Sequence, residues 1–461
     1  MTLRTPWFWR SISLNSHTAR DVFGALFLRD EISTLLESPT RCENPELARF
    51  SICAGNPRNM GGKLQLYTPA MGEILTVLRN LVDRHPTPEP DTEISHLPFI
   101  GGWLGWLGYD VAWEIERLPY RRSDYLPFPI AYWYEPERFA ILDRLQDTLW
   151  FAASSPQQLD EMQQQWETRD EKGWVFPKSQ PTNSPITYLS SQEDYETMVR
   201  RAKDYIHAGD IFQTNLSLRF ETQTAQHPWQ LYQTLHHINP SPFASYWNTP
   251  WGAVVSCSPE RLVRLRDGIA ETRPIAGTRP RGDSPETDKA LEAELLDNRK
   301  ENAEHIMLVD LERNDLGRVC RWGSVRVNEL LTIERYSHVM HLVSNVIGEM
   351  EETRDAIDLI GALFPGGTIT GCPKVRCMEI IEELEPVRRS LFYGSCGYLD
   401  IRGFLDLNIL IRTLLVSRGR VWGQVGAGIV ADSDPTREWF ESLSKAKAQL
   451  AALRGADAIL R

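Results

Sequence analysis

The chain has 461 residues, of which 42% are hydrophobic and 24% charged, a composition typical of a folded protein with a sizeable core. Its net charge of −12, without a run of Lys and Arg, argues against a nucleic-acid partner, and no segment offers the roughly 20 apolar residues that a membrane span needs. The first residues show no secretory leader, and the seven scattered cysteines lack a CxxC pair, so we expect a cytoplasmic protein without a disulfide framework or zinc site.

Three regions follow one another along the chain. Residues 1–150 contain many tryptophans and short strand-like runs such as "FAILDRLQDTLWFAAS", and form the first region. Residues 151–190 are polar and rich in Pro, Ser and Gln, which predicts a linker or an excursion from the fold. Residues 191–455 form the third region, where strands and long helices are expected.

The third region begins with a predicted helix. "SQED" offers a capping box at Ser191, and apolar residues then recur at helical spacing until Gly209. Alternating segments predict strands over 211–220, 252–265, 268–275, 325–333, 395–401 and 407–417, and one long helix is expected over 288–317. This mixture, without an internal repeat, favours α+β layers over a strict βαβ alternation.

The C-terminal stretch "VWGQVGAGIVADSDPTREWFESLSKAKAQLAAL" predicts a strand, a glycine turn and a helix that opens at Pro435. At 100° per residue, Glu438, Glu441 and Lys445 share a stripe away from the apolar face. Taken alone, this stripe indicates a solvated helix face with one Glu441–Lys445 pair.

Two glycine-rich segments match nucleotide motifs weakly. "GAGIVA" fits the dinucleotide pattern at Gly426 and Gly428, but the helix after it starts late and with acidic residues. "FPGGTITGCPKVR" has P-loop glycine spacing without the following Lys-Ser/Thr pair. Thr368 and Thr370 of this loop, together with its glycine amides, would suit a carboxylate, and a plain tight loop before a helix fits the pattern equally well.

The positions of several charged residues suggest that the protein binds a cation and an anion. Glu301 and Glu304 are neighbours on one predicted helix and repel each other unless a cation lies nearby. Glu304 with Glu441 would offer the hard, mostly hydrated oxygen site that Mg²⁺ prefers, completed by a substrate carboxylate. Arg412 and Lys445, in apolar or helical surroundings, would suit an anion, with salt bridging as the alternative.

Eight segments together resemble one enzyme family. They are "IFQTNLSLRF", "SPERL", "RPIAGTRPRG", "ENAEHIMLVDLERNDLGRV", "HVMHLVS", "GGTITGCPKVRCMEIIEELEP", "IRT" and "GAGIVADSDPTREWFESLSKA". They resemble the chorismate-utilising enzymes, specifically the large subunits (component I) of aminodeoxychorismate synthase and anthranilate synthase. "GGWLGWLGYD" and "LLESP" extend the resemblance, more loosely, to the first region. It implies an α+β fold (an α/β sandwich) of two large antiparallel sheets packed face to face, with helices outside and a cleft for Mg²⁺ and chorismate.

The resemblance also implies which residues surround the substrate ring. Ala276 and Gly277 would be small because the ring lies against them, and Thr278 would hydrogen-bond it. Glu260 would be the general acid for the departing C4 hydroxyl, a role that requires burial to raise its pKa. His341 would assist at the same end of the ring, with a hydrogen-bonded core histidine as the alternative.

Charged and polar groups would hold the metal and the carboxylates. By the resemblance, the Mg²⁺ ligands would be Glu304 and Glu441, with Glu301 and Glu438 nearby through water. The metal would bind one chorismate carboxylate. The other carboxylate would be held by the side chains of Arg412 and Lys445 and by the amides of Gly426 and Gly428.

Position 213 separates two reaction types. Isochorismate and salicylate synthases, which resemble this chain, carry a lysine there to activate water. Gln213 has an amide that cannot act as a base, so amination by ammonia is favoured over hydration. No segment resembles a glutamine amidotransferase, so a separate glutaminase subunit is implied.

Two aminating reactions stay open. "QTNLS", "LFPGGTITG" and "SCGYLD" resemble aminodeoxychorismate synthase, whereas "RYSHVMHLVS", "LLESP" and "NPSPF" resemble anthranilate synthase. The latter resemblance implies a tryptophan site at Leu36, Glu37, Ser38, Asn239 and Pro240. Ala276 stands where many aminodeoxychorismate synthases have a nucleophilic lysine, which keeps anthranilate formation open.

We predict Mg²⁺-dependent formation of 4-amino-4-deoxychorismate, in the pathway to p-aminobenzoate and folate. The alternative is conversion of chorismate to anthranilate and pyruvate, in the tryptophan pathway. An alternative of another class is a silent paralogue that binds chorismate or tryptophan to regulate a partner. The expected acid and metal ligands are all present, which favours an enzyme.

Overall fold

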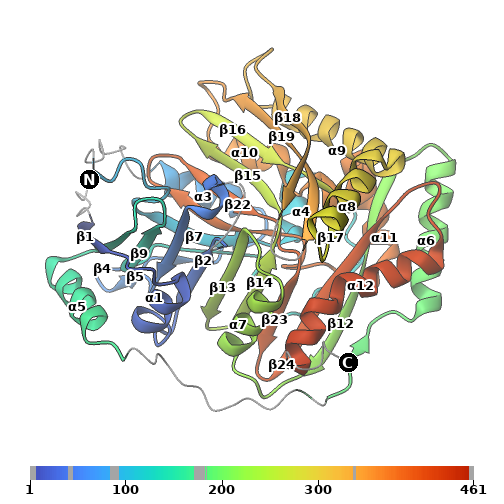
Figure 1. Ribbon diagram of the computed structural model, residues 1–461. Helices are drawn as coiled ribbons and strands as arrows, with labels where there is room; N and C mark the ends of the chain where they lie inside the picture. Colours follow the sequence, from blue (N-terminus) through green and yellow to red (C-terminus); the bar gives the residue numbers. More distant parts are fainter. Residues whose placement is uncertain are drawn as a thin grey trace.

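The computed structural model describes residues 7–39, 45–83, 93–170, 182, 184–335 and 339–455. Within them, two large sheets lie against each other and most helices lie outside (Figure 1). Strand pairing is antiparallel throughout these two sheets. The predicted α+β class with two large antiparallel sheets is confirmed.

The first, 12-stranded sheet combines strands from both ends of the chain. In spatial order its strands are β1 (Phe8–Ser13), β10 (Thr148–Ala153), β9 (Arg138–Asp143), β3 (Phe50–Ala54), β2 (Ser33–Glu37), β13 (Phe243–Thr249), β14 (Gly252–Ser258), β23 (Thr413–Ser417), β24 (Arg420–Ile429), β12 (Gln213–Gln223) and β11 (Thr187–Tyr188), and β20 (Gly371–Cys372) also pairs with β12. The first and third regions of the sequence therefore build one common sheet.

The second, 10-stranded sheet is also shared between the two regions. Its order is β17 (Ile275–Pro280), β19 (Val339–Glu349), β16 (Ile269–Arg273), β15 (Arg261–Arg266), β22 (Leu405–Asn408), β21 (Ser395–Asp400), β7 (Gly102–Leu107), β8 (Ala131–Tyr134) and β6 (Leu66–Tyr67), and β18 (Arg326–Arg335) also pairs with β19. A small separate hairpin consists of β4 (Asn59–Met60) and β5 (Lys63–Leu64).

Helices cover the outer face of the first sheet and one end of the second. Those on the first sheet are α1 (Ala19–Leu26), α5 (Pro156–Glu167), α6 (Gln192–His207), α7 (Pro228–Ile238) and α12 (Pro435–Arg454). Those beside the second sheet are α8 (Pro285–Asp297), α9 (Arg299–Gly317) and α10 (Ala356–Leu363). The others are α2 (Pro45–Ala48), α3 (Ile74–Val82), η1 (Tyr109–Val111), α4 (Ala112–Ile115), η2 (Gly367–Ile369) and α11 (Lys374–Leu384).

The larger hydrophobic core lies between the two sheets. It joins Trp106 of β7 and Trp133 of β8 to Trp247 of β13 and Trp422 of β24, all buried. A second core lies between the first sheet and its helices, where Tyr232 of α7 is fully buried. Because strand side chains alternate between faces, the first sheet can bury residues on both sides.

The expected linker contains a regular helix. Within 151–190, Ser155 caps α5 by accepting a hydrogen bond from the Gln158 amide, and Leu159, Met162 and Trp166 are its buried residues. Spacings of three and four residues place these apolar side chains on one face, which packs on β10 and α1. The polar composition reflects the outer face of this helix, and residues 171–181 and 183 lie outside the described residues.

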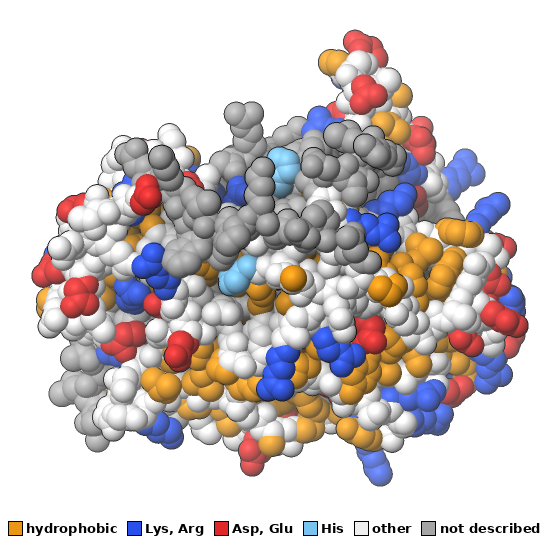
Figure 2. Space-filling view, turned by 90° about the horizontal axis from the view of Figure 1, so that it is seen from below, with side chains coloured by type: hydrophobic (Ala, Val, Ile, Leu, Met, Phe, Trp, Pro, Cys, Tyr) orange, Lys and Arg blue, Asp and Glu red, His pale blue; other side chains and the backbone are white. Residues whose placement is uncertain are grey.

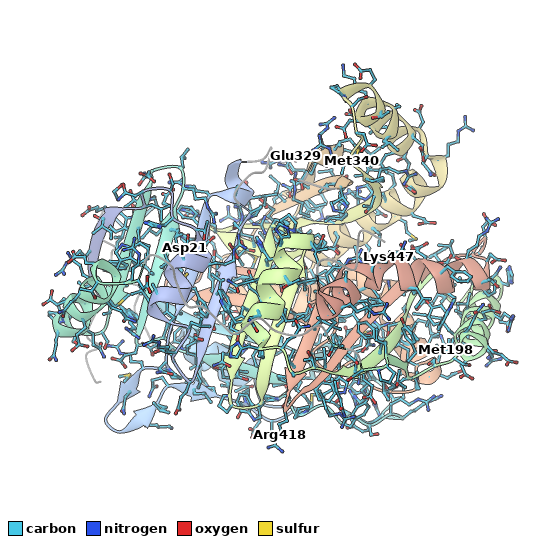
Figure 3. All side chains as sticks on the ribbon, turned by 60° about the horizontal axis from the view of Figure 1, so that its bottom comes forward. Asp21, Met198, Glu329, Met340, Arg418 and Lys447 are labelled. Carbon is cyan, nitrogen blue, oxygen red and sulfur yellow. The ribbon has the colours of Figure 1, made fainter. Side chains whose placement is uncertain are left out.

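Two helices replace the single one expected over 288–317. Asn298 has an extended backbone (φ −72°, ψ 96°), and its side chain accepts a hydrogen bond from the Glu301 amide at 3.1 Å, so α8 ends and α9 begins there. Leu295 of α8 packs against Met340 of β19. Met340 is labelled in Figure 3. By contrast, α6 begins at Ser191 with the predicted capping box and ends near Gly209, as the sequence indicated.

The face seen in Figure 2 carries Lys, Arg, Asp and Glu side chains together, with hydrophobic groups between them. Within the described ranges, no helix combines the length and the apolar character needed to cross a bilayer.

Candidate active site

Glu260 lies where the chain crosses from the first sheet to the second, between β14 and β15. Its side chain is buried, beside Thr368 and the backbone amide of Ile275. Burial raises the pKa of Glu260 to about 8, and the nearby Glu312 carboxylate adds to the rise. At neutral pH this carboxyl therefore keeps its proton, which is the condition that the predicted general acid must meet.

Thr278 and His341 face each other across β17 and β19. Thr278 Oγ1 lies 2.8 Å from His341 Nδ1, and the two residues are register partners. Burial, and then the positive charge of Arg412, lower the pKa of His341 to about 4, so its ring is neutral near pH 7. The structure thus places Thr278, His341 and Arg412, three of the predicted site residues, near one another. Residues 336–338, which belong to the same sequence motif as His341, lie outside the described residues.

Arg412 and Lys445 meet beside β24. Arg412 has a left-handed backbone (φ 52°) and donates to the backbone carbonyl of Lys445, whose Nζ donates to the carbonyl of Gly426 at 3.0 Å. Among the residues that the structure describes, Arg412 forms no ion pair with a carboxylate, and burial lowers its pKa. A guanidinium in this position remains charged and suits an anionic ligand.

The backbone edge at Gly426 and Gly428 is open on one side. Both glycines pair with β12 on their other side, as Ser217↔Gly426 and Asn215↔Gly428. On the open side, β23 pairs with β24 only as far as Gly423. Beyond Gly423, the described part of β24 therefore has no strand partner on that side, where the Gly426 carbonyl accepts from Lys445, and a role of the two glycine amides in binding stays a prediction.

Three buried polar side chains converge on these glycines. A Cβ at Gly426 would lie 2.8 Å from Tyr393 Oη and 3.0 Å from Asn215 Oδ1, and one at Gly428 would lie 2.7 Å from Gln213 Nε2. Within the described part of the chain, Tyr393 Oη, Asn215 Oδ1 and Gln213 Oε1 have no hydrogen-bond partner. Buried groups left without partners are expected where a polar ligand binds. Sequence reasoning missed Tyr393 and Asn215, because no local pattern marks them.

The four predicted metal-site glutamates lie on α9 and α12, which Figure 1 shows on the same side of the molecule. Glu301 Oε1 accepts from Arg279 at 3.0 Å, and its buried Oε2 has no hydrogen-bond partner among the described residues. Glu304, one turn further along α9, is half-buried, and Glu438 of α12 is buried. Glu441 forms the expected ion pair with Lys445, at 2.8 Å.

A buried carboxylate oxygen without a partner fits a hard cation such as Mg²⁺. Among the described residues, no group of three or more His, Cys, Asp or Glu side chains is arranged to hold a metal ion. A site of two carboxylates completed by water and substrate does not require such a group. Magnesium at this site remains a prediction.

The small size of Gly277 has a reason that the sequence did not suggest. A Cβ there would lie 2.2 Å from Glu301 Oε2 and 2.5 Å from Leu295 Cδ1. A side chain at position 277 would displace both of these groups, so the packing of α8 and α9 against β17 also favours a small residue there, and the contact with the substrate ring stays a prediction. Ala276, half-buried beside it, lies at the register shift between β17 and β19.

Thr370 is placed differently from the prediction. Its side chain is fully buried and its hydroxyl donates to the Gly366 carbonyl at 2.8 Å, so it braces the loop from within. Thr368, two residues earlier, lies beside Glu260 and is the threonine of this loop that faces the acid.

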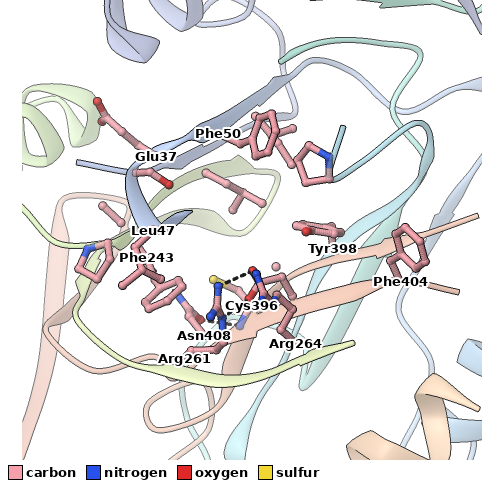
Figure 4. A pocket seen from close by; sticks show the side chains of 18 of the residues that line it. Glu37, Leu47, Phe50, Phe243, Arg261, Arg264, Cys396, Tyr398, Phe404 and Asn408 are labelled. Atoms are coloured by element: carbon pink, nitrogen blue, oxygen red, sulfur yellow. Dashed lines mark hydrogen bonds and ion pairs between the residues drawn. The ribbon is translucent and has the colours of Figure 1, made fainter. Parts of the chain in front are cut away.

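A separate pocket of about 120 Å³ lies between the two sheets (Figure 4). Leu36, Glu37 and Ser38 line it, as predicted for a tryptophan site. Asn239 and Pro240 do not. Their motif contributes Pro242 and Phe243 instead, and the Asn239 side chain donates to the Cys257 carbonyl at 3.4 Å. Other lining residues include Phe50, Arg261, Arg264, Tyr398, Phe404 and Asn408.

The carboxylate of Glu37 is held on the helix side of the first sheet. It accepts from Tyr232 Oη at 2.7 Å and from Arg20 Nε at 3.2 Å, and both partners belong to the outer helices. Since alternate strand residues face opposite sides, Glu37 presents mainly its backbone to the pocket, while Leu36 packs toward the core between the sheets.

Comparison with known proteins shows which family this chain resembles. A family model described as chorismate binding enzyme matches residues 49–451. The chain is 60% identical over 456 residues to "Anthranilate synthase component I-like protein" of Synechocystis sp. (strain ATCC 27184 / PCC 6803 / Kazusa), covering 98% of this chain and 92% of that one. It is 45% identical over 375 residues to "Aminodeoxychorismate synthase component 1" of Bacillus subtilis (strain 168), covering 80% of each.

A solved structure shows the same fold. The crystal structure of anthranilate synthase component I from Streptococcus pneumoniae TIGR4 is similar to this chain with a TM-score of 0.77 and 32% sequence identity, over 87% of this chain and 92% of that one.

Proposed function

The chain belongs to the family of chorismate-binding enzymes, and we propose that it converts chorismate and ammonia to 4-amino-4-deoxychorismate. The coarser assignment, a chorismate-converting enzyme of the anthranilate or aminodeoxychorismate synthase type, follows from the family and its named relatives. The observation that supports the finer proposal is the position of Thr368, which lies beside the buried carboxyl of Glu260. That threonine belongs to "LFPGGTITG", a segment that resembles aminodeoxychorismate synthase.

Glu260 supplies the proton that the reaction needs. The C4 hydroxyl of chorismate is a poor leaving group until it is protonated, and Glu260 gives it a proton as the C–O bond breaks and water leaves. Ammonia provides the electron pair of the new C–N bond and then loses one proton, so chorismate and ammonia yield the product and water. The ring of His341, which contacts Thr278, is neutral near pH 7 and so adds no positive charge that would lower the pKa of a nearby carboxyl.

Arg412, Lys445 and the open edge of β24 hold one substrate carboxylate in this proposal. The protein as a whole is negative, so an anion is captured only where fixed cations and donors create a local positive field. Tyr393 and Asn215, whose buried polar atoms face Gly426, complete this part of the site.

We propose that Mg²⁺ binds the other carboxylate through Glu304 and Glu441, with Glu301 and Glu438 nearby. When bound, the ion neutralises carboxylate charge and fixes the ring. Replacing Glu304 or Glu441 by Gln should remove most activity and weaken Mg²⁺ binding measured by calorimetry, whereas Glu352→Gln, at an exposed position of the surface, should change neither. Full activity of the native chain after thorough chelation would exclude the metal.

Anthranilate formation is the second candidate, because Ala276 offers no nucleophile for a covalent route and because the Synechocystis relative is named anthranilate synthase component I-like. Incubating the purified chain with chorismate, Mg²⁺ and an ammonium salt, followed by mass spectrometry, decides between them. Aminodeoxychorismate without pyruvate supports the proposal, and anthranilate with pyruvate supports the second candidate. No conversion, with chorismate still bound, would indicate a silent paralogue.

We also propose that the pocket between the sheets binds tryptophan. Both apolar and polar side chains line it. One of the lining residues is Arg261, which directly follows the proposed acid Glu260 in the chain. Tryptophan should bind the native chain in calorimetry, and Phe243→Asp should weaken that binding because a carboxylate would be placed in the apolar part of the pocket. Equal affinity of both forms would contradict the assignment.

A further inference from the structure

Glu312 is a second buried carboxyl near Glu260 that none of the roles above uses. It lies on α9 with 5% of its surface exposed, the same fraction as Glu260. The Thr272 hydroxyl of β16 donates to Glu312 Oε2 at 3.0 Å. The backbone amide of Gly367 also faces the Glu312 carboxylate, and a Cβ at Gly367 would lie 3.3 Å from Glu312 Oε1.

Glu312 and Glu260 hold opposite sides of one short loop. Gly367 begins η2, the turn that Glu312 contacts, and Thr368, the next residue, lies beside Glu260. A side chain at position 367 would meet Leu311 Cδ2 at 2.5 Å, so this glycine lets the loop approach α9 closely. The position of Thr368 relative to Glu260 therefore depends on the contact between α9 and the loop.

The positive charge near Glu312 only partly balances the negative charge that its carboxylate would carry. Lys374 of α11 donates to Asp315 Oδ2 at 2.6 Å and to the Leu363 carbonyl at 2.7 Å, so its charge is directed mainly to Asp315. Burial raises the pKa of Glu312 to about 7, and Asp315 adds to the rise, while Lys374, Thr272 and the Gly367 amide oppose it. Toward Glu260, the facing groups are Glu312, Thr368 and the Ile275 amide.

We propose that Glu312 is a positioning residue for Glu260, which fixes the Gly367–Thr368 turn against it and places a second carboxyl nearby, so that Glu260 retains its proton until chorismate takes it. The inference rests on the proposed role of Glu260 as the acid. Two buried carboxyls close together cannot both ionise cheaply, because each charge lies in a poorly solvated site next to the other. Once Glu312 has ionised, loss of the proton from Glu260 becomes more costly.

The test compares Glu312→Gln with Asp310→Asn, which removes a charge from an exposed position of the same helix. In a pH profile of kcat/KM for chorismate, the fall in activity at alkaline pH should begin about one pH unit lower in Glu312→Gln and stay in place in Asp310→Asn. A role that is merely structural would lower the whole profile without moving its alkaline side, and that result would overturn the proposal.

An infrared titration gives a readout that needs no turnover. The native chain should show one carboxyl band that is absent in Glu260→Gln and another that is absent in Glu312→Gln. The Glu260 band should disappear at lower pH in Glu312→Gln than in the native chain. Equal titration of Glu260 in both forms would refute the inference. If Glu312→Gln does not fold, the native chain still decides, because loss of both bands below about pH 6 would exclude the pair.

The same titration separates this inference from the proposed function. If Glu260 and Glu312 titrate as a coupled pair but the chain does not convert chorismate, the proposed function is wrong and the pairing of the two carboxyls still holds. If the chain converts chorismate but the Glu260 band does not shift in Glu312→Gln, the inference is wrong and the proposed function still holds.

Discussion

Burial moves the two central titratable residues of the site in opposite directions. It raises the pKa of Glu260 to about 8 and lowers that of His341 to about 4, since in both cases the poorly solvated surroundings disfavour the charged form. Near pH 7 both side chains are neutral. The positive field for an anionic substrate then comes from Arg412 and Lys445, while Glu260 stays available as a proton donor.

Glu260→Gln should abolish turnover and leave chorismate binding within about twofold, because an amide keeps the shape of the side chain and cannot give a proton. In the native chain, the group acts in its protonated form and its pKa is raised. Activity is therefore present below about pH 8 and lost as pH rises through that value. Calorimetry for binding and a pH profile of kcat/KM measure both effects. Loss of binding together with turnover would show that Glu260 is a binding group instead.

Arg412→Ala should weaken chorismate binding by roughly 10- to 100-fold, the effect of losing one hydrogen bond to a charged group. Arg313→Ala provides the control, because Arg313 is exposed on α9 and pairs only with Asp310 in the structure described, at 2.9 Å. Calorimetric titration with chorismate measures the difference. If both variants bind equally well, Arg412 does not hold the substrate.

At the scale of elements, the cap at Asn298 decides where the acidic side chains of α9 lie. It ends α8 and starts α9, so Glu301 falls in the first turn of a new helix and faces β17 at Gly277. An acidic residue in this turn is also stabilised by the positive end of the helix dipole. The contact between β17 and α9 thus connects the strand that carries Thr278 with the helix that carries two predicted metal-site residues.

Gly277→Ala should destabilise the protein by about 1–3 kcal/mol, the usual cost of overpacking, because the new methyl group would overlap Glu301 and Leu295. It should also weaken Mg²⁺ binding, since Glu301 must move. Gly361→Ala is the matched control: it lies within α10 with nothing in 4 Å of the new Cβ, and should be neutral or stabilising by up to about 1 kcal/mol. Chemical unfolding and calorimetry measure both. Equal stability of the two variants would contradict the packing argument.

At the scale of the whole molecule, both the candidate active site and the pocket depend on the sandwich of two sheets. Glu260 and Arg261 are consecutive, yet the first belongs to the candidate active site and the second lines the pocket, because the chain changes sheets at this point. A ligand in the pocket would therefore contact the residue next to the acid.

The isolated chain should use ammonium salts but not glutamine, and a small glutaminase subunit should confer use of glutamine. Near neutral pH most ammonia in water is protonated and is no longer a nucleophile, so a partner must deliver it along a path protected from bulk water. Product assays with glutamine, with and without candidate glutaminase subunits, test this. Glutamine-driven product from the chain alone would overturn the expectation, and failure with every partner despite good ammonium-driven turnover would remove its support.

The amino-acid sequence was sufficient to assign the family, the fold class and those elements whose signals are local. The capping box at Ser191 and the apolar spacing of α6 depend only on neighbouring residues, and so does the Glu441–Lys445 pair, because residues four apart share a helix face. Glu260, Thr278 and His341 were found through motifs, and the structure brings them to one region of the fold. Their chemical roles and the product of the reaction stay predictions.

The contacts between residues far apart in the chain could be identified only in the folded protein. The packing contact at position 277 comes from a helix that begins more than twenty residues later. Thr370 turns into its own loop, while Thr368 faces the acid. Tyr393 and Asn215 became candidates only because folding left their polar atoms buried near Gly426. Burial and pairing depend on which elements pack together, and long-range packing is not encoded in any local pattern.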